Sequence, residues 1–199
     1  MVTANSLLGM AISIAFRLGI HRDGTHFTFS PFQTEMRRRI WHHIQLLDAW
    51  SIENIGTETL IPSELVDCAY PQNSNDASWD TSQFSTSIPK VHTGFTDMTI
   101  ALIQYEIAAM FRIILKHGSS ENTSNETFFA FHTRFIHEAK AKLELTYLDH
   151  LDDGKVKQRL ARHIAELGLE RILLAQKRMG VRRMQPEEYS SRISDYERR

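Results

Sequence analysis

Residues 18–48 read LGIHRDGTHFTFSPFQTEMRRRIWHHIQLLD, and this stretch decides the fold: it holds the end of one helix, a polar turn and the start of a second helix. Ser30 is a typical N-cap residue, and Pro31 suits the first helical position, where no backbone N–H is needed. Gln33 completes a capping box with Ser30. We therefore predict a helix over residues 31–54. Its buried stripe should follow three- and four-residue spacing, through Phe32, Met36, Ile40, Ile44, Leu47 and Ser51.

Four further helices are expected, over residues 4–18, 97–117, 126–148 and 152–180. Gly19 should end the first in a left-handed conformation, and Asp152 and Asp153 favour the start of the last. The helix over 97–117 is apolar nearly all round and should be central. The faces expected to be buried in the other three are Leu7, Ala11, Ile14 and Leu18; Phe128, Phe131, Phe135, Ala139 and Leu143; and Val156, Leu160, Ile164, Leu167, Leu174 and Met179.

The predicted fold class is all-α, an irregular multi-helix bundle with one long polar loop over about residues 71–95. Trp79 and Phe84 could pin this loop, and residues 62–65 could add one short helical turn. We expect a helical domain over residues 1–181, followed by a charged tail over 182–199. The first helix begins almost at the start of the sequence, so the chain resembles the central part of a longer module.

Composition narrows the class of function. The 199 residues are 42% hydrophobic, enough for one globular domain. Lys and Arg total 23 against 24 Asp and Glu, a formal charge of −1, which argues against direct specific binding to nucleic acid. Cys68 is the only cysteine, so no internal disulfide can form. No segment reaches the roughly 20 apolar residues that span a bilayer, so no membrane role is expected.

Several motifs of the sequence resemble the fungal-specific transcription factor domain. They are HRDGTH and SPFQTEMRRRIW, then Gly56, Ile61 and YPQNSNDASW at 70–79, and more loosely TGFTDMTIALIQYEIA at 93–108. This domain is the middle homology region of zinc-cluster transcription factors. The resemblance implies an all-helical regulatory domain that acts in the nucleus through protein partners, as a homodimer or on the transcription machinery, or through a small effector. In the family, DNA is bound by an N-terminal zinc cluster.

That zinc cluster needs six closely spaced cysteines, because its two zinc ions share thiolate ligands. The chain has only Cys68, so the DNA-binding zinc cluster is absent from it, and no cofactor is expected here. Two alternatives stay open. One is a stand-alone helical protein that competes with an intact factor for partners, and the other is a small helical metal-dependent enzyme with a His-based site.

His21, Arg22 and Asp23 match the centre of a kinase catalytic loop. A kinase also needs an asparagine five residues after the aspartate, where this chain has Thr28, and a glycine-rich loop and a DFG motif, which it lacks. We therefore expect the three residues to bond backbone groups and neighbouring charges in the turn between the first two helices.

A metal site could involve His21, Asp23 and His26, with His42 or His43 from the next helix. Adjacent histidines on a helix point about 100° apart, so at most one of that pair can face a given ion. No HExxH motif is present. We therefore assign no catalytic, cofactor-binding or metal-binding residue.

Arg37, Arg38 and Arg39 fan around the helix, so solvation is the default for all three, although at least one guanidinium could lie inward. Glu35 and Arg39 are expected to form an i,i+4 pair. Asp48 falls on the predicted buried stripe and would need a cationic partner, for which we predict Arg17 or Arg22. The candidates for structural or regulatory roles are therefore His21, Arg22, Asp23, Trp41 and Asp48.

Overall fold

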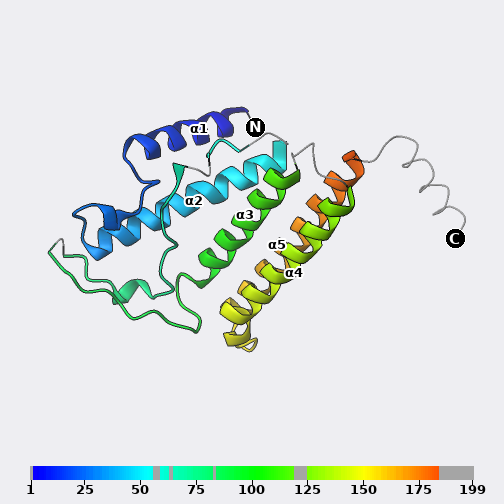
Figure 1. Cartoon of the computed structure of the whole chain (residues 1–199). Helices are drawn as coiled ribbons and strands as arrows, with labels where there is room; N and C mark the ends of the chain where they lie inside the picture. Colours follow the sequence, from blue (N-terminus) through cyan, green and yellow to red (C-terminus); the bar gives the residue numbers. More distant parts are fainter. Residues whose placement is uncertain (1, 56–58, 63–64, 83, 119–124, 184–199) are drawn as a thin grey trace, which may run out of the picture.

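The structure, a computed structural model, describes residues 2–55, 59–62, 65–82, 84–118 and 125–183 (Figure 1). Its α-helices are α1 (Val2–Arg17), α2 (Pro31–Ile55), α3 (Thr99–Gly118), α4 (Asn125–Thr146) and α5 (Val156–Arg183). Short 3-10 helices are η1 (Gly24–His26), η3 (Asp76–Ser78) and η4 (Leu148–His150). No strand occurs in these ranges, which confirms the all-α prediction.

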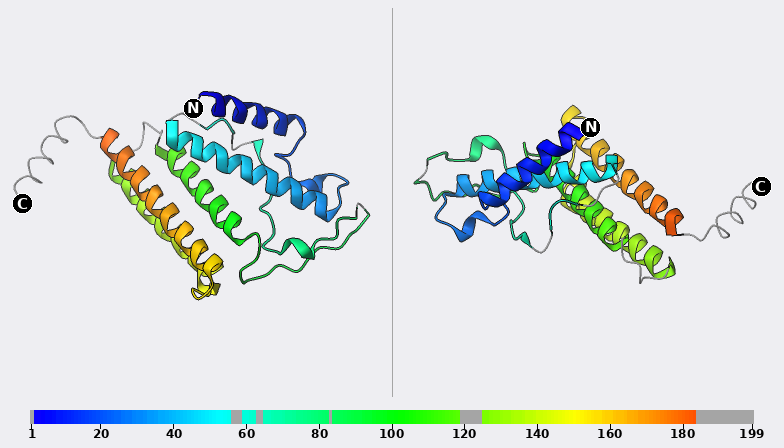
Figure 2. Two further views of the ribbon diagram at one scale, coloured as in Figure 1. Left: turned by 180° about the vertical axis from the view of Figure 1, so that it is seen from behind. Right: turned by 90° about the horizontal axis from the view of Figure 1, so that it is seen from above.

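The helices form a layered bundle. α1 lies along one side of α2, and α3 packs on the opposite side of α2 (Figures 1 and 2). α4 and α5 run side by side and both pack against α3. In the part of the chain that is described, no helix is long and apolar enough to cross a membrane.

The predicted helix ends are largely confirmed. Ser30 and Gln33 form the capping box: Gln33 N donates to Ser30 Oγ at 3.3 Å, and Ser30 N donates to Gln33 Oε1 at 3.0 Å. Gly19 follows α1 with φ +63°, the left-handed conformation that favours glycine. α5 begins at Val156, after a turn in which Asp152 Oδ1 accepts from Gly154 N at 3.0 Å. Gly56, residues 63–64 of the expected short turn and the tail from 184 onward lie outside the described residues.

α3 is the centre of the main core, as its composition predicts. Ile103 and Ile114 are fully buried, and apolar residues of α2, α4 and α5 pack around them. A second, smaller cluster lies between α1 and α2 and consists of Ile12, Ala15, Trp41 and Ile61. The bundle therefore has one large core and one small one.

Three predicted buried faces are only partly right, since Ile44 of α2 and Ile164 and Met179 of α5 pack half-buried against a core while other predicted residues do not. On α1 the buried residues are Ile12 and Ala15; on α2 they include Trp41, Leu46, Ala49 and Ile52; on α5 they include Ala161, Ala165, Leu169 and Ile172. Most of the predicted residues are instead exposed, namely Leu7, Ile14, Leu18, Ile40, Leu47, Val156, Leu160, Leu167 and Leu174. The buried faces are instead lined by other large apolar residues together with alanines, which let the helix backbones approach closely.

The long loop is held to the bundle at defined points. Trp79 is buried, and its Nε1 donates to Ser74 Oγ at 2.9 Å. Phe84, expected as a second anchor, is 85% exposed and pins nothing. The short helix η3 and the polar contacts described below take over that role.

Candidate functional site

Asp23 is the centre of a polar cluster at the junction of α1 and α2. Its carboxylate accepts from Arg38 Nε at 2.7 Å and from Arg38 Nη2 at 2.8 Å, a bidentate pair. It also accepts from Thr25 N at 3.0 Å and from Ala69 N at 2.9 Å. One buried carboxylate therefore ties together η1, α2 and the segment before the long loop.

The charge state of Asp23 follows from these contacts. The hydrogen bonds from Arg38 lower the pKa of Asp23 far below its usual range, and the bonds from Thr25 and Ala69 act in the same direction. Asp23 in turn raises the pKa of Arg38. The pair is ionised at neutral pH, and Asp23 bonds backbone groups and a neighbouring charge in the turn, as predicted. The prediction is wrong for the side chain of His21, whose buried Nδ1 has no hydrogen-bond partner among the described residues.

Arg22 points the other way, to Asp67. Arg22 Nε donates to Asp67 Oδ2 at 2.7 Å, and His26 Nε2 lies 3.2 Å from the same oxygen. Asp67 Oδ1 accepts from the backbone N of Asp23 at 3.0 Å. Asp67 therefore reinforces the same junction from its exposed side.

Glu35 forms a second polar cluster on the next turn of α2. It is almost fully buried, and its carboxylate accepts from Arg39 Nε at 2.8 Å, which confirms the predicted i,i+4 pair. It also accepts from Gln72 N at 3.1 Å. Arg39 Nη1 reaches Asp76 of η3 at 2.6 Å. The long loop is thus held to α2 by the hydrogen bond to the Glu35 carboxylate and by the ion pair between Arg39 and Asp76.

Solvation was the default prediction for the three arginines, with an inward-facing guanidinium as the alternative, and the structure supports the alternative because all three are partly buried. Besides Arg38 and Arg39, Arg37 Nη2 donates to the carbonyls of Leu18 at 3.1 Å and Gly19 at 2.7 Å, the free end of α1. Its guanidinium also lies 4.6 Å from the ring centroid of Phe29. Because consecutive helical residues fan out, each arginine meets a different neighbouring segment.

Trp41 and His21 lie together in the small core between α1 and α2. Trp41 is fully buried, and Phe16 packs edge-on against it with the ring centroids 5.6 Å apart. His21 lies 4.6 Å from Phe16 and 6.0 Å from Trp41, centroid to centroid. Burial lowers the pKa of His21, and Arg22 lowers it further, so its imidazole is neutral at pH 7.

Asp48 forms a separate polar cluster near the other end of α2. It is 1% exposed and accepts from Thr59 Oγ1 at 2.6 Å and from Leu60 N at 3.1 Å. Its arginine partner is Arg112 of α3, with Nη1 3.7 Å from Oδ2, so the predicted Arg17 or Arg22 is wrong. Arg112 Nη2 also donates to Ile61 O at 2.9 Å. The pair therefore joins α2 to α3 rather than to α1.

The histidines do not gather around one point. His42 Nδ1 lies 2.9 Å from Arg38 O, and the ring packs against Tyr70. His43 packs against Tyr105, while His26 faces Asp67. Within the described ranges, no group of three or more His, Cys, Asp or Glu side chains is placed to hold a metal ion.

Sequence reasoning missed the residues that complete these clusters. The role of Arg38 had a detectable signal, since charged residues on the core side of an amphipathic helix need partners, as did the burial of Glu35, whose pair with Arg39 was predicted. Asp67 and Arg112 had none, because they reach their partners through long-range contacts between segments far apart in the chain.

The comparisons with known proteins agree on one family. The model of the "Fungal specific transcription factor domain" matches residues 3–165. No solved structure matches the chain.

Three relatives illustrate the similarity. The Zn(2)-C6 fungal-type transcription factor pigI of Monascus ruber is 33% identical over 58% of this chain and 14% of its own length. The Pyriculol/pyriculariol biosynthesis cluster transcription factor 1 of Pyricularia oryzae is 35% identical over 63% of this chain and 16% of its own. Transcription factor phm2 of a Pyrenochaetopsis species is 27% identical over 94% of this chain and 26% of its own.

The chain thus spans about a quarter or less of the length of these relatives. Both the family and the relatives are transcription factors rather than enzymes, which supports a role in transcription regulation. The match extends from α1 into α5 and includes the Asp23, Glu35 and Asp48 clusters. The chain therefore belongs to the fungal specific transcription factor domain family.

Proposed function

We propose that this chain is a regulatory domain that controls transcription in the nucleus through protein contacts, without catalysis of its own. The observation that carries the proposal is the family match across residues 3–165. The formal charge of −1 and the single cysteine fit a domain that does not itself read DNA. In this proposal, DNA binding belongs to a six-cysteine zinc cluster in a longer protein.

The outer face of α1 offers a surface for such contacts. Leu7, Met10, Ile14 and Leu18 form an apolar stripe at helical spacing, and each side chain is between 52% and 61% exposed. We call these four residues the α1 stripe. Figure 2 shows α1 at the edge of the bundle, with only its inner side against α2. Contiguous exposed apolar residues typically mark interaction surfaces.

The test fuses the chain to a heterologous DNA-binding domain and measures a reporter gene in a fungal host. The double variant Leu7→Lys with Ile14→Lys places two charges on the α1 stripe. If protein contacts made there control transcription, reporter output changes several-fold while the circular dichroism spectrum is unchanged. The matched control is Leu145→Lys on α4, where Leu145 is 72% exposed and lies outside the stripe.

Equal reporter output from the wild type and the stripe variant would exclude the α1 stripe as the regulatory surface. An unchanged reporter when the whole chain is deleted from the fusion would exclude the regulatory function itself. Sequence-selective, salt-dependent binding of the isolated chain to duplex DNA would contradict the assignment of DNA binding to another segment.

A further inference from the structure

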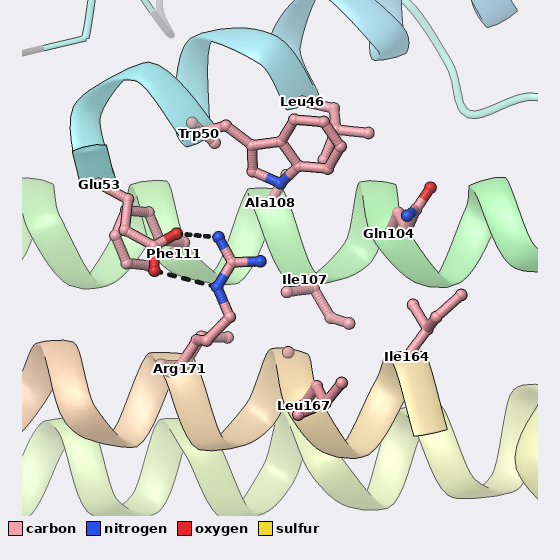
Figure 3. Close-up of a pocket in the computed structure, with 13 residues that line it drawn as sticks. Leu46, Trp50, Glu53, Gln104, Ile107, Ala108, Phe111, Ile164, Leu167 and Arg171 are labelled. Carbon is pink, nitrogen blue, oxygen red and sulfur yellow. Dashed lines mark hydrogen bonds and ion pairs between the residues drawn. The ribbon is translucent and has the colours of Figure 1, made fainter. Parts of the chain in front are cut away.

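A cavity lies between α2, α3 and α5, away from the three polar clusters. Its volume is about 170 Å³, and it is open on one side. The residues that line it are Leu46, Ala49, Trp50, Glu53, Gln104, Ile107, Ala108, Phe111, Ile164, Leu167, Gly168, Arg171 and Ile172. All of them belong to helices, so the shape of the cavity is set by the bundle and not by a loop (Figure 3).

Three small residues leave the space that forms the cavity. Ala49 of α2 and Ala108 of α3 are both buried at the wall of the cavity, where a longer apolar side chain would fill it. Gly168 of α5 lets Ile107 lie against the helix backbone, since a Cβ at Gly168 would come within 2.4 Å of Ile107 Cδ1.

Polar groups lie only at the rim. Arg171 of α5 pairs with Glu53 of α2 through Nε, at 3.0 Å, and through Nη2. Its remaining nitrogen, Nη1, points away from Glu53 toward the space between Trp50 and Ile107 (Figure 3). Gln104 lies at the rim further along α3. The cavity therefore combines an apolar interior with a hydrogen-bond donor at its mouth, the pattern of a small-molecule site.

We propose that this cavity binds a compact, uncharged and mostly apolar molecule that carries one hydrogen-bond acceptor. An apolar cavity of about 150 Å³ in another protein accepts benzene, so this one holds a single six-membered ring, and a short substituent can extend into its open mouth. The acceptor oxygen takes a hydrogen bond from Arg171 Nη1. The molecule is uncharged because Glu53 already neutralises Arg171, and a second carboxylate there would be repelled.

The test compares two molecules of the same shape, acetophenone and α-methylstyrene, which differ in a carbonyl oxygen against a methylene group. The whole chain, labelled at the isoleucine δ1 methyl groups, is titrated by NMR. We expect acetophenone to shift Ile107, Ile164 and Ile172 and to leave Ile12 and Ile61 of the small core unchanged. Binding should saturate in the range of about 0.1–1 mM, as suits so small a ligand.

Two variants separate shape from hydrogen bonding. Ala108→Leu fills the cavity and should weaken both molecules at least about tenfold, a change of about 1.4 kcal/mol. Arg171→Met removes the donor from a half-exposed position, so acetophenone should lose its advantage over α-methylstyrene. Ala130→Leu, on the exposed face of α4, is the control and should change neither affinity.

The proposal is overturned if the three cavity isoleucines do not move at 10 mM acetophenone, on the order of ten times the weakest expected dissociation constant. It is also overturned if α-methylstyrene binds as tightly as acetophenone to the wild type, or if benzoate binds more tightly than either. Should Ala108→Leu fail to fold, Arg171→Met alone decides the role of the donor. These readouts are binding shifts, so they stand or fall independently of the transcriptional function.

Discussion

The two sides of α2 contact the rest of the bundle mainly through different kinds of interaction. On one side, α1 and the long loop are held by carboxylate–arginine clusters around Asp23 and Glu35, with only a small apolar core. On the other, α3 packs against α2, α4 and α5 through a large apolar core, and the ion pair Asp48–Arg112 adds a polar link between α2 and α3. Directional polar contacts fix the position of α1 and the long loop on α2. The packing of α3, α4 and α5 is stabilised mainly by the buried apolar area and by the fit of the helix surfaces.

Because the interactions differ, substitutions should destabilise the two regions in different ways. A charged cluster loses its effect when one partner is removed or titrated, because a buried charge is left without compensation. An apolar contact through glycine or alanine is lost when a side chain grows. The predictions below use this contrast, from the largest expected effect to the smallest.

Trp41→Ala should have the largest effect of the variants considered. Trp41 is the largest side chain of the small core, and its removal should lower the free energy of unfolding by about 3–5 kcal/mol. Hydrogen exchange should show lost protection in α1 and retained protection in α3. Urea unfolding followed by circular dichroism gives the magnitude.

The control for this variant is Trp41→Phe. The indole N–H of Trp41 is buried with no hydrogen-bond partner among the described residues, so phenylalanine removes an unsatisfied donor and keeps most of the ring. We expect a loss of about 1 kcal/mol or less. Equal losses of protection in α1 and α3 after Trp41→Ala would show that the two regions unfold as one unit.

Asp23→Asn should cost about 2–4 kcal/mol at pH 7, because it leaves Arg38 half-buried without its bidentate partner. It should also change the dependence of stability on pH. The pKa of Asp23 is lowered in the folded state, so its contribution is present above the unfolded pKa of about 3.9 and is lost as the pH falls below it. The variant should therefore show a shallower loss of stability between about pH 5 and pH 2.

Asp149→Asn, at an exposed aspartate outside the clusters, is the matched control and should leave the unfolding curve at pH 7 unchanged. A double-mutant cycle with Arg38→Met measures the coupling of the pair. If the wild type and Asp23→Asn have parallel pH profiles, the ionised carboxylate of Asp23 does not stabilise the junction.

The sequence predicted the positions of the helices better than it predicted which face of each helix is buried. The capping box at Ser30, the left-handed Gly19 and the apolar sequence of α3 are local signals, and each is confirmed. The buried faces of α2 and α5 are set by their neighbours. In α5, Ala165 and Gly168 are buried beside Leu169 and Ile172 while Leu167 is exposed, because the helix turns a face toward α3 that includes small residues as well as large apolar ones.

In the candidate site too, local features could be predicted from the sequence, whereas contacts between distant segments could not. HRD could be assigned to the turn because it lies between two predicted helices and the other motifs of a kinase are missing. That Asp23 caps the short helix η1 is visible only in the structure. Its main partner, Arg38, lies 15 residues away, and the partner of Asp48 is Arg112 on another helix. Burial of Asp48 could be predicted from its place on the helix, whereas the choice among arginines depends on the packing of α2 against α3.

Gly168→Ala tests the close contact between α3 and α5. Alanine normally stabilises a helix interior by about 1 kcal/mol relative to glycine, but here the new Cβ would come within 2.4 Å of Ile107 Cδ1 and 2.9 Å of Ile107 Cγ2. We expect a net loss of about 1–2 kcal/mol in thermal or urea unfolding. Ile107→Val removes the nearest methyl group, so the double variant should lose less than the sum of the two single variants.

Gly9→Ala is the same substitution in the other region, with the opposite expected sign. Gly9 lies inside α1, and a Cβ there would meet nothing within 4 Å, so only the gain in helix propensity remains. We expect a gain of about 0.5–1 kcal/mol, provided that α1 unfolds together with the rest of the chain. If Trp41→Ala shows that α1 unfolds first, the gain should appear only in the hydrogen exchange of α1 and not in global unfolding. A loss of stability would mean that the outer side of α1 is packed against another element, which would contradict the exposed α1 stripe.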